Sequence, residues 1–203
     1  MIKFFRDIGN YLFKIRSYTP LPFLIIMVLF AEPTFHSILI GILVALSGET
    51  IRLWAVSYAG SETRTTSDVG GSTLVTQGPY GYVRNPLYIG NILIYLGIGI
   101  MSNSLFPYLQ IFALIYFTFQ YYCIILSEEE YLMNTFSYKY KMYFNSVNRF
   151  LPSGNNIPKE IKSDLNFQVD EGLKSERRTL QALAISFAII LIIYFSDIKI
   201  LAS

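Results

Sequence analysis

The sequence predicts an all-α protein, a polytopic bundle of about five transmembrane helices. The chain of 203 residues is 53% hydrophobic and only 15% charged, with a mean hydropathy of +0.42. Soluble domains carry about 25% charged residues, so this chain cannot cover a water-facing surface in the usual way. A span takes about 20 apolar residues, so the length allows about six at most.

Five apolar runs, separated by turn signals, are the expected spans. Glu32-Pro33-Thr34 ends the first run, and Ser102-Asn103-Ser104 with Pro107 ends the third, so the runs predict two helical hairpins and a last single helix. The runs cover residues 18–31, 35–58, 87–101, 108–126 and 179–195.

The segments between the runs are polar or amphipathic. Residues 1–17 mix bulky apolar and basic side chains and predict an interfacial helix. Residues 60–83 are glycine-rich and too polar to span, and residues 153–177 indicate an exposed linker or a short soluble helix. In 127–152, apolar residues recur at helical spacing and predict an amphipathic helix on the membrane surface. These apolar residues are Leu132, Phe136, Tyr140, Tyr143 and Val147.

Positive charges give the expected orientation. With five spans starting inside, 15 of the 16 Lys and Arg residues fall on one side, if Arg52 at the inner end of the second span is included. Only Lys199 falls on the other side. Cytoplasmic segments of membrane proteins are rich in Lys and Arg, so we expect an integral, multi-pass protein with its polar segments in the cytoplasm.

Composition also excludes several kinds of site. A net charge of +2 without a basic stripe disfavours nucleic acid as a partner. The single cysteine, Cys123, cannot form an internal disulfide or a cysteine cage, and His36 is the only histidine. We therefore expect no metal site. The oligomeric state is left open.

The segment Gly78–Gly90, GPYGYVRNPLYIG, enters the third run and is the first candidate site. Pro86 suits the first turn of a helix, where its missing N–H costs nothing. The unpaired N–H groups of that turn, together with Arg84, make a positive end suited to a carboxylate. The alternative is an ordinary glycine- and proline-rich helix entry with an interfacial arginine and tyrosine belt.

The acidic run Glu128-Glu129-Glu130 closes the fourth span and is the second candidate. It lies on the same expected face as Arg84, so the hairpin should bring acidic and basic groups together. The alternative is a run of solvated acids. Glu49 and Arg52, three residues apart in the second span, are weaker candidates for substrate contact, because ionisable groups in a span are costly. They could equally pair with each other, with Arg52 reaching to the interface.

Together the two segments resemble a known family. The first resembles the GPYxYVRHPxYxG motif of membrane methyltransferases, which include isoprenylcysteine carboxyl methyltransferases and phospholipid N-methyltransferases. The stretch from Glu128-Glu129 to Pro152 resembles the family pattern EExxLxxxFGxxYxxYxxxVxRFxP. The sequence departs from these patterns at Asn85, where the family has histidine, and at Ser137, where it has glycine. The arginine that often precedes the glutamate pair in the prenylcysteine branch is also absent.

The resemblance implies a methyltransferase core over residues 1–152, with its motifs in 74–152, and an added linker and helix over 153–203. It implies S-adenosyl-L-methionine as methyl donor, with Arg84 and Glu129 as catalytic residues and a lipid-borne, prenylated or otherwise hydrophobic acceptor. Alternatives are a phospholipid, amine or small-thiol acceptor, or a membrane scaffold that has lost catalysis. The residues that the resemblance assigns to donor binding are Asn85, Pro86, Tyr88, Gly90, Glu128 and Glu129.

Overall fold

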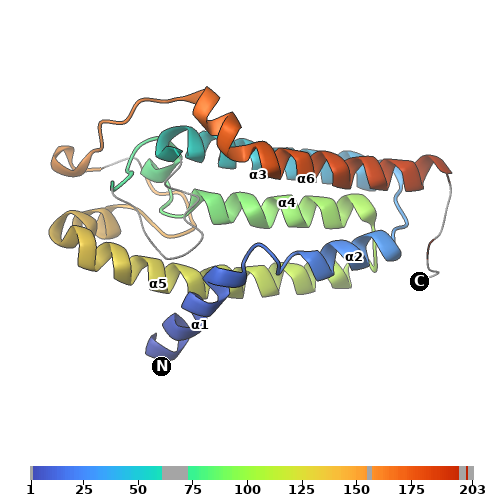
Figure 1. Cartoon of the computed structure of the whole chain (residues 1–203), viewed down its shortest axis with the longest axis horizontal. Helices are drawn as coiled ribbons and strands as arrows, with labels where there is room; N and C mark the ends of the chain where they lie inside the picture. The colour runs from blue at the N-terminus through green and yellow to red at the C-terminus, as the bar shows by residue number, and fades with distance from the viewer. Residues whose placement is uncertain (1, 61–72, 155–156, 197–199, 201–203) are drawn as a thin grey trace. The chain divides into compact units, whose positions relative to one another are not determined.

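The structure, a computed structural model, describes residues 2–60, 73–154, 157–196 and 200. Every regular element in these residues is helical, as predicted (Figure 1). Two single-turn helices, η2 (Gly78–Gly81) and η3 (Lys159–Ile161), lie in the connections. The α-helices are α1 (Ile2–Ile15), α2 (Leu21–Leu29), α3 (Phe35–Ala59), α4 (Pro86–Ser102), α5 (Tyr108–Ser146) and α6 (Val169–Ser196).

All five apolar runs form helices, but they differ in length. Within the described residues, α3, α5 and α6 are long and apolar enough to cross a membrane, and α4 is a shorter apolar helix of 17 residues. The nine residues of α2 rise only about 14 Å, less than half of a hydrocarbon core about 30 Å thick. The helical class is confirmed, whereas five complete spans stay a prediction.

The residues labelled α5 form two helices that meet at a break, so the last part of the segment predicted as a surface helix is separated from the apolar span. The element covers 39 residues and is interrupted once, at Ser137, with φ 44° and ψ −111°. A positive φ is strained for a residue with a Cβ and free for glycine. This geometry gives a physical reason for the glycine that the family pattern has at the position of Ser137.

The apolar stripe of this last part of α5 packs against protein. Its buried members Tyr140, Tyr143 and Val147 form a cluster with Ile161 of η3. Leu74 and Ile157 are among the partly buried residues that pack on the cluster. The periodicity therefore predicted the buried face, while the segments that cover it come from elsewhere in the chain.

The chain divides into two compact units, and α3, α4, α5 and α6 contribute residues to both. The first unit comprises 1–14, 51–89 and 120–176, and the second comprises 15–50, 90–119 and 177–203. In the second unit, helices α3 and α4 approach closely at glycines: a Cβ on Gly97 would lie 2.5 Å from the backbone nitrogen of Ala45. Phe23 of α2 packs there against Phe112, Tyr116 and Phe117 of α5.

Candidate functional site

The two motif segments lie side by side in the first unit, joined through their backbones. The Arg84 amide donates to the carbonyl of Asn148 over 2.8 Å, within a parallel bridge between Val83 and Asn148. The Ser153 amide donates to the carbonyl of Tyr82, also over 2.8 Å. The segment before α4 and the segment after α5 therefore share one short stretch of main-chain pairing.

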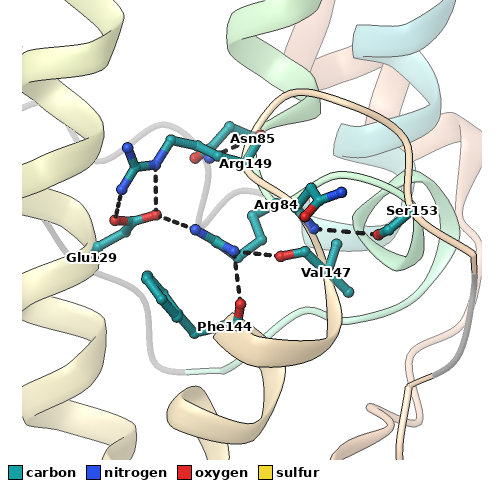
Figure 2. A network of polar contacts seen from close by, with 8 residues as sticks. Arg84, Asn85, Glu129, Phe144, Val147, Arg149 and Ser153 are labelled. Carbon is teal, nitrogen blue, oxygen red and sulfur yellow. Dashed lines mark hydrogen bonds and ion pairs between the residues drawn. The ribbon is translucent and has the colours of Figure 1, made fainter.

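Glu129 is the centre of the charged network that the two segments form (Figure 2). Its Oε1 accepts from the Arg84 guanidinium at 2.7 Å, and its Oε2 accepts from Arg149 at 2.5 Å. Arg149 adds a second bond from Nε to Oε1 at 3.0 Å, which makes this pair bidentate. The expected meeting of the basic and acidic segments is thus observed.

Arg84 is committed to holding the end of α5. Its Nη1 donates to the carbonyls of Phe144, at 2.9 Å, and Val147, and its guanidinium lies 4.2 Å from the centre of the Phe144 ring. A cation is favourable beside the last carbonyls of a helix. With a side chain only 7% exposed, Arg84 serves here to join the two motifs. Its predicted catalytic role stays a prediction.

Arg149 is a site residue that was not among the predicted ones. Its side chain is 24% exposed, more than that of Arg84. Burial lowers the pKa of the Arg149 guanidinium, but the hydrogen bond and charge of Glu129 more than offset this and raise it overall. The arginine of the RF pair that follows the apolar stripe was the signal that could have found it.

Tyr88 and Glu128 form a second polar contact beside this network. The Tyr88 hydroxyl donates to Oε1 of Glu128 over 2.6 Å, and its ring stacks on Tyr121 with 4.5 Å between centroids. Stacking fixes the ring, and the ring then fixes the carboxylate. Glu128 and Glu129 are neighbours in α5, yet one is held by a phenol and the other by two arginines.

Asn85 and Pro86 begin α4 as the sequence predicted. Pro86 is buried and is the first residue of the helix, and the Asn85 carbonyl accepts from the amide of Ile89. The Asn85 side-chain amide donates to the carbonyl of Arg149 over 3.3 Å. This position therefore uses a hydrogen-bond donor, which asparagine supplies as well as histidine.

Two of the predicted residues belong to the second unit. Gly90 is buried there, and its carbonyl would lie 2.6 Å from a Cβ placed on Gly48. Glu49 is 5% exposed in the same unit. Arg52 belongs to the first unit and donates to Glu176 of α6 over 2.6 Å, a partner that the sequence did not suggest.

The charges of the site favour a ligand that carries both signs. Arg149 presents a positive group, and Glu128 presents a negative one at a position fixed by Tyr88. Such an arrangement can hold an amino acid-like group, with its carboxylate and its ammonium. Within the described part of the chain, no cluster of three or more His, Cys, Asp or Glu side chains could hold a metal ion.

Comparison with known proteins places these features in a family. The model of the family described as phospholipid methyltransferase matches residues 36–139, about half of the chain. The cobalt-zinc-cadmium resistance protein CzcN of Cupriavidus metallidurans is 32% identical over 114 residues, which are 56% of this chain and 47% of that protein. The nickel-cobalt-cadmium resistance protein NccN of Alcaligenes xylosoxydans xylosoxydans is 34% identical over 98 residues, 48% of this chain and 40% of that protein.

The match therefore spans less than half the length of either relative. No solved structure matches the chain. The family match covers α3, α4 and most of α5, including Arg84 and the glutamate pair. The resemblance seen in the two motifs is confirmed at the level of the family: the chain belongs to the phospholipid methyltransferase family of membrane methyltransferases.

Proposed function

We propose that the protein transfers a methyl group from S-adenosylmethionine to a hydrophobic, lipid-borne acceptor at the cytoplasmic surface of a membrane. The observation that carries the proposal is the joining of the two motifs by Arg84, Glu129 and Arg149, with Glu128 held beside them by Tyr88. The family supports methyl transfer, and the distribution of Lys and Arg supports the cytoplasmic side.

The residues of the site fit the chemistry of this donor. Its amino acid end carries a carboxylate and an ammonium group, and its sulfonium carries the methyl group in activated form. In our proposal, Arg149 and the first N–H groups of α4 bind the carboxylate. Glu128 accepts hydrogen bonds from the ammonium group or from the ribose hydroxyls. Glu129 keeps both arginines in place.

Methyl transfer is an in-line displacement, so the protein contributes chiefly orientation and removal of water. A carboxylate acceptor, such as that of a prenylated cysteine, is already a nucleophile. An amine or thiol acceptor needs a base, and Glu128 is the candidate, because it lies beside the site and its position is fixed. The family description favours a lipid acceptor, and isoprenylcysteine is the second one to test.

Binding of the donor is the first test. We expect purified protein in nanodiscs to bind S-adenosylmethionine, and Glu128→Gln to weaken this binding about tenfold or more, because a charge-assisted hydrogen bond is lost. Glu160→Gln, at an exposed glutamate of η3, is the matched control and should bind as wild type does. Wild-type protein that binds no donor would refute the proposal.

The acceptor is tested with two probes and labelled donor. Transfer to N-acetyl-S-farnesylcysteine gives a methyl ester, whose label mild base releases. Transfer to phosphatidylethanolamine in the nanodisc gives a base-stable N-methyl lipid. The stability of the label therefore separates the two acceptors.

A second candidate function comes from the names of the two relatives, which refer to resistance to cobalt, zinc, cadmium and nickel. We propose that the methyl transfer serves resistance to divalent metal cations. Cells that lack the gene should then grow less well in these metals, and wild-type protein, but not Glu128→Gln, should restore growth. Equal rescue by both proteins would instead favour a scaffold that needs no catalysis.

A further inference from the structure

Helix α1 is fixed to α5 by one of its faces. A Cβ on Gly9 would collide with the backbone carbonyl of Cys123, so the two helices touch at this point. On the same face, Arg6 donates to Glu130 at 2.6 Å and Phe13 is buried, with 4% of its surface exposed. Residues three or four apart lie on one side of a helix, so these contacts define the inner face of α1.

The opposite side of α1 carries a second apolar stripe. Phe4, Ile8 and Tyr11 follow one another at spacings of four and three residues, so they too share one side of the helix. Phe4 is 64% exposed and Tyr11 is 65% exposed. Most of the surface of these two rings is therefore left uncovered by the described part of the chain.

A polar stripe runs beside this apolar one. Its members are Lys3, Asp7, Asn10 and Lys14, again at helical spacing, and all four are exposed. Two lysines against one aspartate leave one net positive charge. An apolar stripe beside a basic one is typical of a helix that lies in a membrane interface. The lysine stems can then extend along the apolar surface and hold their ammonium groups at the lipid phosphates.

The contacts of α1 lie where the apolar run of α5 ends. Helix α5 is long and apolar enough to cross a membrane, and its apolar run ends at residue 126, between the two contact points Cys123 and Glu130. The 14 residues of α1 rise only about 21 Å, which is shorter than a hydrocarbon core of about 30 Å. Its place and its length therefore suit the boundary between hydrocarbon and water.

We propose that the outer face of α1 binds the anionic phospholipids of the membrane surface. Phe4, Ile8 and Tyr11 lie among the upper parts of the acyl chains, and Lys3 and Lys14 bind the headgroup phosphates. The positive charge of the polar stripe complements anionic headgroups and gives no advantage with zwitterionic ones. The inference goes beyond the proposed function and does not depend on methyl transfer.

The test uses tryptophan fluorescence of the full chain in nanodiscs. Trp54 is the single tryptophan, so Tyr11→Trp in a Trp54→Phe background places one reporter on the apolar stripe. Lipids with brominated acyl chains quench a tryptophan that they contact. We expect brominated phosphatidylglycerol to quench with a constant about fivefold that of brominated phosphatidylcholine at the same mole fraction, the factor that one net charge near the membrane surface gives. Adding Lys3→Gln/Lys14→Gln should bring this ratio to one or below.

Asn10→Trp in the same background is the matched control. It places the reporter on the exposed polar stripe of the same helix, where both lipids should quench it much less. Equal quenching at positions 10 and 11 would overturn the proposed orientation of α1. If Tyr11→Trp does not fold, Phe4→Trp takes its place, because it lies two turns away on the same stripe.

The remaining outcomes also decide. Equal quenching by the two lipids with both lysines present would overturn the inference, because the face would then have no preference for anionic lipid. Quenching by neither lipid would also overturn it, since a second copy of the chain or water would then cover the face. None of these measurements uses a methyl donor, so they leave the proposed function to its own tests.

Discussion

Different interactions stabilise the interiors of the two units. In the first unit, charged side chains meet in the interior: Glu129 pairs with Arg84 and Arg149, and Glu176 pairs with Arg52. In the second unit, glycines let helices approach until backbones touch, and aromatic rings fill the remaining space. Close packing of small residues is the usual way to join helices in a membrane, where lipid removes the hydrophobic advantage of burial.

The difference indicates where function lies. A buried ion pair is weak evidence for stability, because the cost of removing two charges from water often exceeds their attraction. The proposed donor site would use the paired charges of the first unit, whereas the second unit, in which Glu49 is also buried, is packed mainly through small and aromatic side chains.

The strongest test of this contrast is Glu129→Gln. It leaves the buried Arg84 and the partly exposed Arg149 with no full counter-charge, so we expect a loss of about 3 kcal/mol in unfolding free energy. Methyl transfer should fall to background. Chemical unfolding in detergent measures the first effect, and labelled donor measures the second.

The matched control is Glu130→Gln. Glu130 pairs with Arg6 at 2.6 Å, but both side chains are substantially exposed, at 45% and 34%. Such pairs contribute about 0–1 kcal/mol. If Glu129→Gln lowered the unfolding free energy no more than this control does, the buried network would not stabilise the first unit.

Gly97→Ala tests the second unit. The new Cβ would lie 2.5 Å from the Ala45 nitrogen and 2.7 Å from the Gly41 carbonyl oxygen, and backbone atoms cannot move aside cheaply. We expect a loss of about 2–3 kcal/mol, as for other overpacked sites. The Kd for S-adenosylmethionine, measured on folded protein, should stay near the wild-type value.

Gly99→Ala in the same helix serves as its control. Its nearest neighbour is the end of the flexible Met27 side chain, at 3.0 Å, so the loss should be smaller than for Gly97→Ala. The interpretation of α3 and α4 as a glycine-packed pair fails if the two variants unfold at the same denaturant concentration.

Tyr88→Phe tests whether Glu128, in the first unit, belongs to the donor site. It removes the hydroxyl that donates to Glu128 and keeps the ring that stacks on Tyr121. Because a hydrogen bond to a charged group contributes about 1.5–3 kcal/mol, we expect a loss near the lower value. Donor affinity should fall more than stability does, which titration and unfolding of the same preparation will show. Unchanged donor affinity would separate Glu128 from the donor site.

Ser137→Gly should have the smallest effect and the opposite sign. At φ 44°, glycine in place of serine relieves backbone strain of about 1–3 kcal/mol. The greater flexibility of glycine in the unfolded chain costs about 0.5–1 kcal/mol. We expect a gain of about 1 kcal/mol in unfolding free energy. Ser186→Gly, in the regular part of α6, should instead lose about 0.5 kcal/mol. A loss in both variants would refute the strained break in α5.

Local sequence patterns were enough to predict the helical class and the buried face of the last part of α5. Apolar runs, the proline at the start of α4 and the spacing from Leu132 to Val147 are local signals, since each depends on residues within a few turns of one helix. The two motifs also sufficed to name the family, and they included Arg84 and Glu129, which the structure joins across 45 residues.

The partners of the charged side chains, in contrast, depend on the tertiary fold. Glu129 pairs with two arginines, whereas Glu128 accepts a hydrogen bond from a tyrosine, although the two glutamates are adjacent and chemically alike. The fold also pairs Arg52 with Glu176, 124 residues further along the chain, a contact that no sequence periodicity could indicate. Helix formation depends on local backbone geometry, whereas a buried charge pairs with an opposite charge that the tertiary fold brings close to it.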